Sequence, residues 1–123
     1  MSIMLQLDTV FYPIYIEEKM MSKFFVLLLG ILASSSFAAD FPVEQKNKAF
    51  SVSSLKVKVG DTVTFKNVDA FNHNIFSLSD AKSFDLGSYP QGQSRSVTMD
   101  KPGTVEVECS IHPDMKMTVE VAK

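Results

Sequence analysis

The sequence contains no tryptophan, two histidines and a single cysteine, Cys109, within 123 residues. A lone cysteine excludes an intramolecular disulfide framework and any paired-cysteine zinc or redox motif. An excess of one charge is also missing, because 12 basic and 14 acidic side chains give a formal charge of −2. Nucleic-acid binding, which depends on a basic surface, is therefore not expected. The length fits one domain and excludes large multi-step enzyme architectures.

The chain has no apolar run long enough to span a bilayer. The apolar segment Phe24–Ala33 has about 10 residues, whereas a spanning helix needs roughly 20. Two lysines precede this segment, and Ser36 and Ala38 place small residues at −3 and −1 of a cleavage site after Ala38. This layout predicts a secretory signal peptide over residues 20–38 rather than a retained membrane anchor.

Residues 1–19 do not fit an export signal, because they carry three acidic side chains in front of it. Since the Met20-Met21 pair begins the signal, we predict that residues 1–19 are an over-extended gene start. Export then leaves residues 39–123 as a mature domain, expected in the periplasm as a monomer with no stable membrane insertion. A domain of this size without a disulfide has a modest core, so a bound metal is one remaining source of stability.

After Ala39 the chain alternates apolar and polar residues with a period of two, which is typical of β-strands. No helix of useful length is expected, so the predicted fold class is all-β, an antiparallel sandwich or a small barrel. A long loop, with room for one short strand or helical turn, is expected over residues 79–93, which are rich in glycine and proline. The expected strands cover residues 55–59, 62–65, 94–99, 105–109 and 117–121.

The alternation also predicts where side chains point. Cys109 shares the parity of Val105 and Val107, so it faces the core at the end of its strand. His73 shares the parity of Ile75 and faces inward where a strand begins. Two further sets are assigned by residue type. Core aromatics are expected at Phe65, Phe71, Phe76 and Phe84, with the end that carries Cys109 as the alternative for Phe71. A solvated face, alternatively a docking patch, is expected at Lys46, Lys48, Lys56 and Lys58.

The residues that carry chemistry lie close together in the sequence. Cys109 and His112 share one short segment with Met115 and Met117, and His73 lies upstream. A thiolate, two imidazoles and a weak thioether are the donor set of a blue-copper site. The spacing Cys-x2-His-x2-Met lets one loop supply three of these donors.

Four segments within about residues 50–121 stand in a recognisable order: Val57–Phe65, His73-Asn74, Lys101–Thr104 and Cys109-x2-His112-x2-Met115. On these residues the chain resembles the cupredoxins, the blue copper proteins, in their plastocyanin/amicyanin-like form. The resemblance implies a Greek-key β-sandwich that holds one copper ion near one end and transfers single electrons. It also implies that Asn74 hydrogen-bonds to Ser110 and ties two ligand loops together. The copper ligands that it implies are His73, Cys109, His112 and Met115.

Two positions depart from the family pattern. Asn72 stands where many members carry proline, so the loop before His73 is expected to be less rigid. Met117 stands where members tend to have glycine, and the longer Cys-x2-His-x4-Met loop of plastocyanins proper would select it as the axial ligand. The sequence that follows the loop matches the family better when Met115 is the ligand.

The expected function is single-electron transfer between a donor and an acceptor protein that the sequence does not identify. His112 would present its ring edge to solvent, with Ile111 and Pro113 as an apolar rim suited to brief contacts. The alternatives are a non-redox copper carrier or storage protein with the same ligands, and zinc in the same donors. A thiol enzyme is not expected, because it needs a substrate cleft and a third group to orient the base.

Overall fold

The computed structural model describes residues 35–123, so the predictions for residues 1–19 and for most of the signal 20–38 lie outside the described residues. Residues Phe37–Lys123 form one compact unit. In the described part of the chain, no helix is both long and apolar enough to cross a membrane. The strands are β1 (Asp40–Lys46), β2 (Ala49–Phe50), β3 (Ser54–Lys58), β4 (Thr62–Asn67), β5 (His73–Ser79), β6 (Lys82–Tyr89), β7 (Ser94–Thr98), β8 (Gly103–Cys109) and β9 (Lys116–Ala122).

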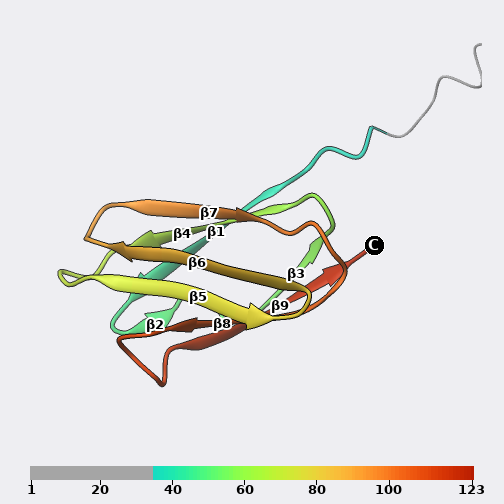
Figure 1. Ribbon diagram of the computed structural model, residues 1–123. Coiled ribbons are helices and arrows are strands. Elements are labelled where there is room, and N and C mark those ends of the chain that lie inside the picture. The colour runs from blue at the N-terminus through green and yellow to red at the C-terminus, as the bar shows by residue number, and fades with distance from the viewer. Residues whose placement is uncertain (1–34) are drawn as a thin grey trace, which may run out of the picture. The chain divides into compact units, whose positions relative to one another are not determined.

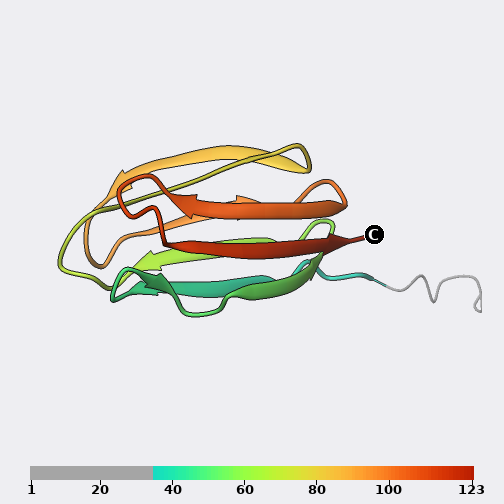
Figure 2. The same ribbon diagram turned by 90° about the horizontal axis from the view of Figure 1, so that it is seen from below.

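The strands form two sheets that pack as a sandwich (Figures 1 and 2). One sheet has the order β2-β1-β4-β7 and the other the order β3-β9-β8-β5-β6. The predicted all-β sandwich is confirmed, but the sheets are mixed rather than antiparallel, because β1 pairs with β4 and β3 pairs with β9 in parallel. The chain crosses between the sheets after β2, β3, β4, β6 and β7, so paired strands are not always sequence neighbours. Periodicity within one strand cannot reveal such pairings.

The core lies between the sheets and follows the predicted alternation. Cys109 is buried with Val105 and Val107 on β8, and His73 is buried with Ile75 on β5. Burying a valine or isoleucine side chain contributes about 1.5–3 kcal/mol, so these inner faces supply much of the stability of the unit. The other fully or nearly fully buried apolar side chains are Val43, Val57, Val63, Phe65, Tyr89, Val97, Met99, Met115, Met117, Val119 and Val121.

The prediction of a long loop over residues 79–93 is wrong, because most of this segment is strand β6. Its alternation is interrupted: the pairing of β5 with β6 shifts register between Asn74 and Phe76, which leaves one additional residue on β6. Gly87 lies at this point with φ 72°. A bulge of this kind moves the inward-facing positions from even to odd residue numbers, so the period-two signal is lost over the strand.

The aromatic predictions hold only in part. Phe65 is fully buried, and Phe84 is partly buried against the core. Phe76 is half-buried on the opposite face of β5 from Ile75, and Phe71 is 40% exposed. The four lysines are exposed as predicted, but Lys46 and Lys48 lie at the β1–β2 turn whereas Lys56 and Lys58 lie on β3 of the other sheet.

Three connections lie at the same end of the sandwich, opposite the C-terminus. They are the β1–β2 turn, the segment that leads into β5, and the loop from β8 to β9, which are on the left in both views (Figures 1 and 2). Cys109 and His112 lie at the start and in the middle of the last of these, and His73 is the first residue of β5. The fold therefore gathers the predicted donors at this end.

Candidate metal centre

Neighbouring strands bring the cysteine and both histidines together. β5 pairs with β8, with Ile75 opposite Cys109, so His73 at the start of β5 lies just beyond the end of β8. The Cys109 Sγ atom is 3.6 Å from Nδ1 of His73 and 3.7 Å from Nδ1 of His112. The three donor atoms all lie within 4.8 Å of one another. The sequence prediction that these three side chains converge is therefore correct.

The separations test whether a single ion fits these donors. For bond lengths of about 2.3 Å to sulfur and about 2.05 Å to nitrogen, distances of 3.6 and 3.7 Å correspond to angles of about 112° and 116° at the ion. These angles lie between tetrahedral and trigonal geometry. A soft thiolate with two imidazoles suits copper, and the same donors also suit zinc.

Backbone hydrogen bonds close the loop that carries Cys109 and His112. The N–H of Met115 donates to the carbonyl of His112 (2.9 Å), and the N–H of Cys109 donates to the carbonyl of Met115 (3.2 Å). Since both ends of the loop are bonded to each other, its donors keep a defined spacing without a metal.

The predicted tie between the two ligand loops is present, and main-chain atoms make it. The N–H of Ser110 donates to the main-chain carbonyl of Asn74 at 3.0 Å. The side-chain oxygen of Asn74 is buried and has no hydrogen-bond partner among the described residues. The side chain of Asn74 therefore does not make this tie.

Both candidate thioethers are buried, with 1% of Met115 and 3% of Met117 exposed. Their positions along the sheet differ. In the β8–β9 register Met117 is opposite Val107 and Lys116 is opposite Glu108, so Met115 is the residue that meets Cys109. Two residues along a strand correspond to about 7 Å, so Met117 is displaced from the thiolate by that distance along the sheet.

Asp69 belongs to the site, although the sequence analysis did not predict it. Its Oδ2 atom is 2.8 Å from Nε2 of His73, which is fully buried. The carboxylate also accepts the N–H groups of Asn47 (2.7 Å) and Lys48 (3.1 Å). Burial acts to raise the pKa of Asp69, but the hydrogen bonds from His73 and from these two amides outweigh it and lower the pKa below 3.8. A carboxylate four residues before a candidate histidine ligand was the available sequence signal.

His112 lies at the surface of the site beside an exposed aromatic ring. The centroid of the Phe71 ring is 5.3 Å from the rings of both His73 and His112. Phe71 was expected either in the core or at the end of the sandwich that carries the donors, and it lies at that end. Burial lowers the pKa of His112 below 6.5, and the nearby positive charge of Lys48 lowers it further. A neutral imidazole is the form that binds a metal, so this environment favours coordination.

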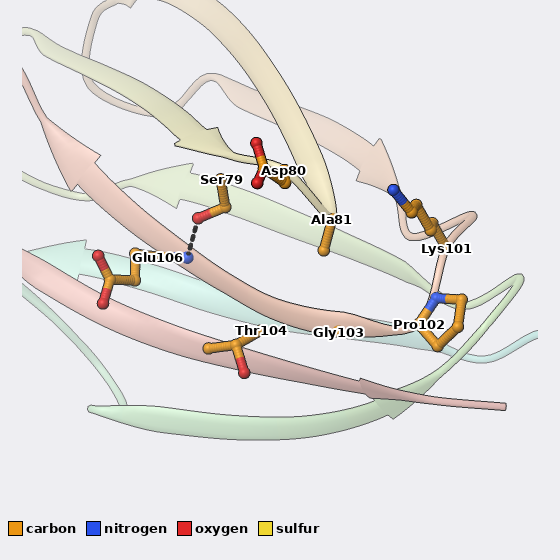
Figure 3. A pocket seen from close by; sticks show the side chains of 8 residues that line it. All are labelled: Ser79, Asp80, Ala81, Lys101, Pro102, Gly103, Thr104 and Glu106. Carbon is orange, nitrogen blue, oxygen red and sulfur yellow. Dashed lines mark hydrogen bonds between the residues drawn. The ribbon is translucent and has the colours of Figure 1, made fainter.

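A hollow of about 470 Å³ lies away from these donors, between the β5–β6 turn and the segment that leads into β8 (Figure 3). Its Ser79 hydroxyl oxygen accepts the N–H of Glu106 (2.8 Å), which links β5 to β8. Gly103 has φ 142°, and a Cβ placed there would lie 2.8 Å from that of Ala81. The hollow is built by close-packed turns and does not supply a substrate cleft beside Cys109.

Comparison with known proteins gives matches over most of the described residues. Residues 38–122 match the sequence model of a family described as copper binding proteins, plastocyanin/azurin family. Amicyanin-alpha of Methylorubrum extorquens is 32% identical over 87 residues, which cover 68% of this chain and 73% of that protein. The methylamine utilization protein MauL of the same organism is 30% identical over 86 residues, or 69% and 75% of the two chains. A chloroplastic plastocyanin of Fritillaria agrestis is 30% identical, and the match covers 75% of this chain but 63% of that protein.

Solved structures agree with these sequence matches. A copper(I) form of an amicyanin variant superimposes with a TM-score of 0.62 at 29% identity, covering 68% of this chain and 82% of that one. A copper-containing nitrite reductase from Thermus scotoductus superimposes with a TM-score of 0.64 at 27% identity, but the match is 22% of its length. The sandwich is thus a fold that copper proteins of different sizes contain.

Proposed function

Because the chain belongs to the plastocyanin/azurin family of copper-binding proteins, we propose that it carries single electrons between redox partner proteins. The family membership confirms the predicted resemblance and copper as the metal, and its plastocyanin and amicyanin relatives agree with the prediction that the chain is not an enzyme. The proposed ligands are His73, Cys109, His112 and Met115. The observation that carries the proposal is the convergence of one thiolate and two imidazoles at one end of the sandwich.

The proposed role of each residue follows from its position. When bound, copper supplies a one-electron couple in a site whose soft sulfur donors suit copper(I) and whose imidazoles suit both oxidation states. Cys109 and His73 are buried and held by paired strands, so they resist rearrangement when the charge of the site changes. His112 is partly exposed and lies nearest to solvent, which makes its ring edge the proposed route for electrons.

The surface around His112 supports brief contacts with partners. Phe71 is 40% exposed and Ile111 is 51% exposed, and Pro113 is also exposed beside them. A small apolar surface, with Lys48 over the Phe71 ring at 5.9 Å, suits the low-area contacts of redox encounters, which form and separate quickly.

Met115 is the proposed axial ligand rather than Met117. The sheet register places it opposite Cys109, and its main-chain carbonyl accepts the N–H of Cys109. Met117 packs in the core opposite Val107, in line with the other inward residues of β9.

Export to the periplasm is also proposed, with a signal peptide over residues 20–38 and no translation of residues 1–19. Two observations support a domain that begins at residue 39: β1 starts at Asp40, and the family match starts at residue 38. Mass spectrometry of the exported protein tests both points. A product that contains residues 1–19 would refute the proposed gene start.

The function is tested by loading the purified protein with copper(II) and recording its visible spectrum and a voltammogram. We expect an intense thiolate-to-copper absorption and a reversible one-electron couple. Cys109→Ala should abolish the absorption, whereas Val107→Ala, which also shortens an inward side chain of β8, should retain it. A colourless copper complex without a reversible couple would favour the copper carrier, and zinc in protein isolated from its source would favour a zinc site.

A further inference from the structure

We propose that Asp69 is a positioning residue for the copper site, and that the β1–β2 turn holds it in place. The inference rests on the copper-binding function proposed above and adds two elements that the ligand set does not contain. Its starting point is the 2.8 Å contact between Asp69 Oδ2 and Nε2 of the fully buried His73.

This contact selects which ring nitrogen of His73 carries the proton. A carboxylate accepts and does not donate, so the proton of the neutral ring lies on Nε2 and the lone pair lies on Nδ1. Nδ1 is the atom that faces Cys109 Sγ at 3.6 Å. A carboxylate behind a ligating histidine also makes the ring a stronger donor, which favours the more highly charged metal ion.

The carboxylate is itself held by the turn between β1 and β2. Asn47 and Lys48 occupy the two central positions of this turn, with φ 55° and 57°. Non-glycine residues rarely adopt this left-handed conformation, and here it directs two successive N–H groups to Asp69 at 2.7 and 3.1 Å. The β1–β2 turn therefore adopts a strained backbone conformation in which both N–H groups bind the Asp69 carboxylate.

The segment from Asp69 to His73 is held from its other side by Asn67. The side-chain oxygen of Asn67 accepts the N–H of Asp69 (2.9 Å), and its side-chain nitrogen donates to the carbonyls of Phe71 (2.8 Å) and Tyr89 (3.0 Å). Asp69 is therefore fixed by its own main chain and by the turn. Its carboxylate can orient the ring of His73 because it has little freedom of its own.

The test compares Asp69→Asn with Asp114→Asn. Both remove one negative charge, but Asp114 is exposed on the loop that carries His112, and the hydrogen bond and ion pair of His73 Nε2 in the described residues are with Asp69. We expect Asp69→Asn to weaken copper(II) binding by about tenfold to a hundredfold. We expect copper(I) binding to fall tenfold less than copper(II) binding. This difference corresponds to a rise of about 59 mV in the midpoint potential. The control should change the affinity by less than about threefold, and far-UV circular dichroism checks the fold of both.

A second measurement does not depend on any variant folding. Nitrogen-15 NMR of the metal-free protein should find the His73 proton on Nε2. A proton on Nδ1 overturns the proposal, as does an Asp69→Asn potential equal to that of Asp114→Asn.

Inserting one glycine between Asn47 and Lys48 should raise the potential in wild type but have no added effect with Asp69→Asn. If copper binds no form of the protein, the proposed function fails, but the NMR result still decides the role of Asp69.

A different observation carries a second inference, about the start of the mature chain. The N–H of Ala39 donates to Oδ1 of Asp61 at 2.9 Å, and the carbonyl of Ala39 accepts the N–H of Thr62 at 2.9 Å. Asp61 is only 7% exposed, and its other oxygen accepts the N–H of Lys58 at 2.8 Å. The first residue after the proposed cleavage site is thus already bonded to a buried carboxylate.

We infer that processing converts this hydrogen bond into an ion pair. Hydrolysis of the Ala38–Ala39 peptide bond by a signal peptidase consumes one water and leaves a carboxylate on Ala38 and an ammonium on Ala39. The new ammonium occupies the place of an amide that donates to Asp61. A charged donor to a carboxylate binds more strongly than a neutral one, so the mature protein is more stable than one that carries extra residues before Ala39.

The experiment compares the processed protein with a form that retains Ala38, each with Asp61 and with Asp61→Asn. We expect the native start to raise the folding equilibrium constant by about fivefold at low salt, and by less at high salt. The gain should vanish with Asp61→Asn, and an equal gain in both backgrounds would overturn the ion pair. Mass spectrometry is run first: a start other than Ala39 would refute the cleavage site itself, independently of the role of Asp61.

Discussion

Replacing each candidate thioether by leucine separates the two assignments of the axial ligand. Met115 and Met117 are the same residue type, two positions apart, with 1% and 3% of their area exposed. Leucine conserves the volume, so each substitution should cost less than about 1.5 kcal/mol in the metal-free protein. The fold therefore responds similarly to both changes, and any difference in the copper-loaded form reports on the sulfur.

The expected difference follows from the sheet register. Met115 meets Cys109, whereas Met117 is opposite Val107, about 7 Å further along the strand. Losing an axial donor disfavours copper(II) more than copper(I), because the less charged ion needs fewer donors. A tenfold change in that preference is a shift of about 59 mV, and we expect a rise of this order for Met115→Leu. Met117→Leu should shift the potential by less than about a third of that value.

The assay is voltammetry of the two copper-loaded variants beside wild type, with urea unfolding of the metal-free forms as the measure of the fold. A large shift for Met117→Leu and none for Met115→Leu would refute the argument from register and select the longer loop. No shift in either variant would mean that the site has no thioether ligand.

Three further outcomes are expected. Gly103→Ala should lower the free energy of unfolding by more than about 1 kcal/mol in urea titrations, because φ is 142° and the new Cβ would meet Ala81 at 2.8 Å. Tyr89→Phe should cost about 1–3 kcal/mol in the same assay, since it leaves the side-chain N–H of Gln45 without its 2.8 Å partner in a buried site; no cost would show that water replaces the hydroxyl. The pKa of His112 is lowered by burial from 6.5, so the unfolded chain takes up this proton first. The contribution of His112 to the free energy of unfolding of the metal-free protein should be complete above about pH 6.5. It should fall as the pH drops through the pKa of the folded state and then level off. A His112→Gln variant that loses the same stability over this pH range would contradict this assignment.

The fold was predictable where one strand carries its own signal. The alternation around Val105 and Val107 places them inward in any sandwich, because successive side chains of a strand point to opposite faces. Strand β6 was not predictable in this way, because the irregular pairing near Gly87 breaks the alternation. The parallel pairing of β1 with β4 was also hidden, since it depends on where the chain crosses between sheets.

The metal centre, like the fold, was predictable from the sequence only in part. The sequence alone determined the kinds of donor and the short spacing from Cys109 to His112, because a loop of a few residues leaves its side chains little choice of position. Only the tertiary structure decided that Met115 meets Cys109, that the main chain of Asn74 bonds Ser110, and that Asp69 lies behind His73. These contacts join residues through the pairing of strands and the conformation of turns, and such pairings are set by the packing of the whole sandwich rather than by any local pattern.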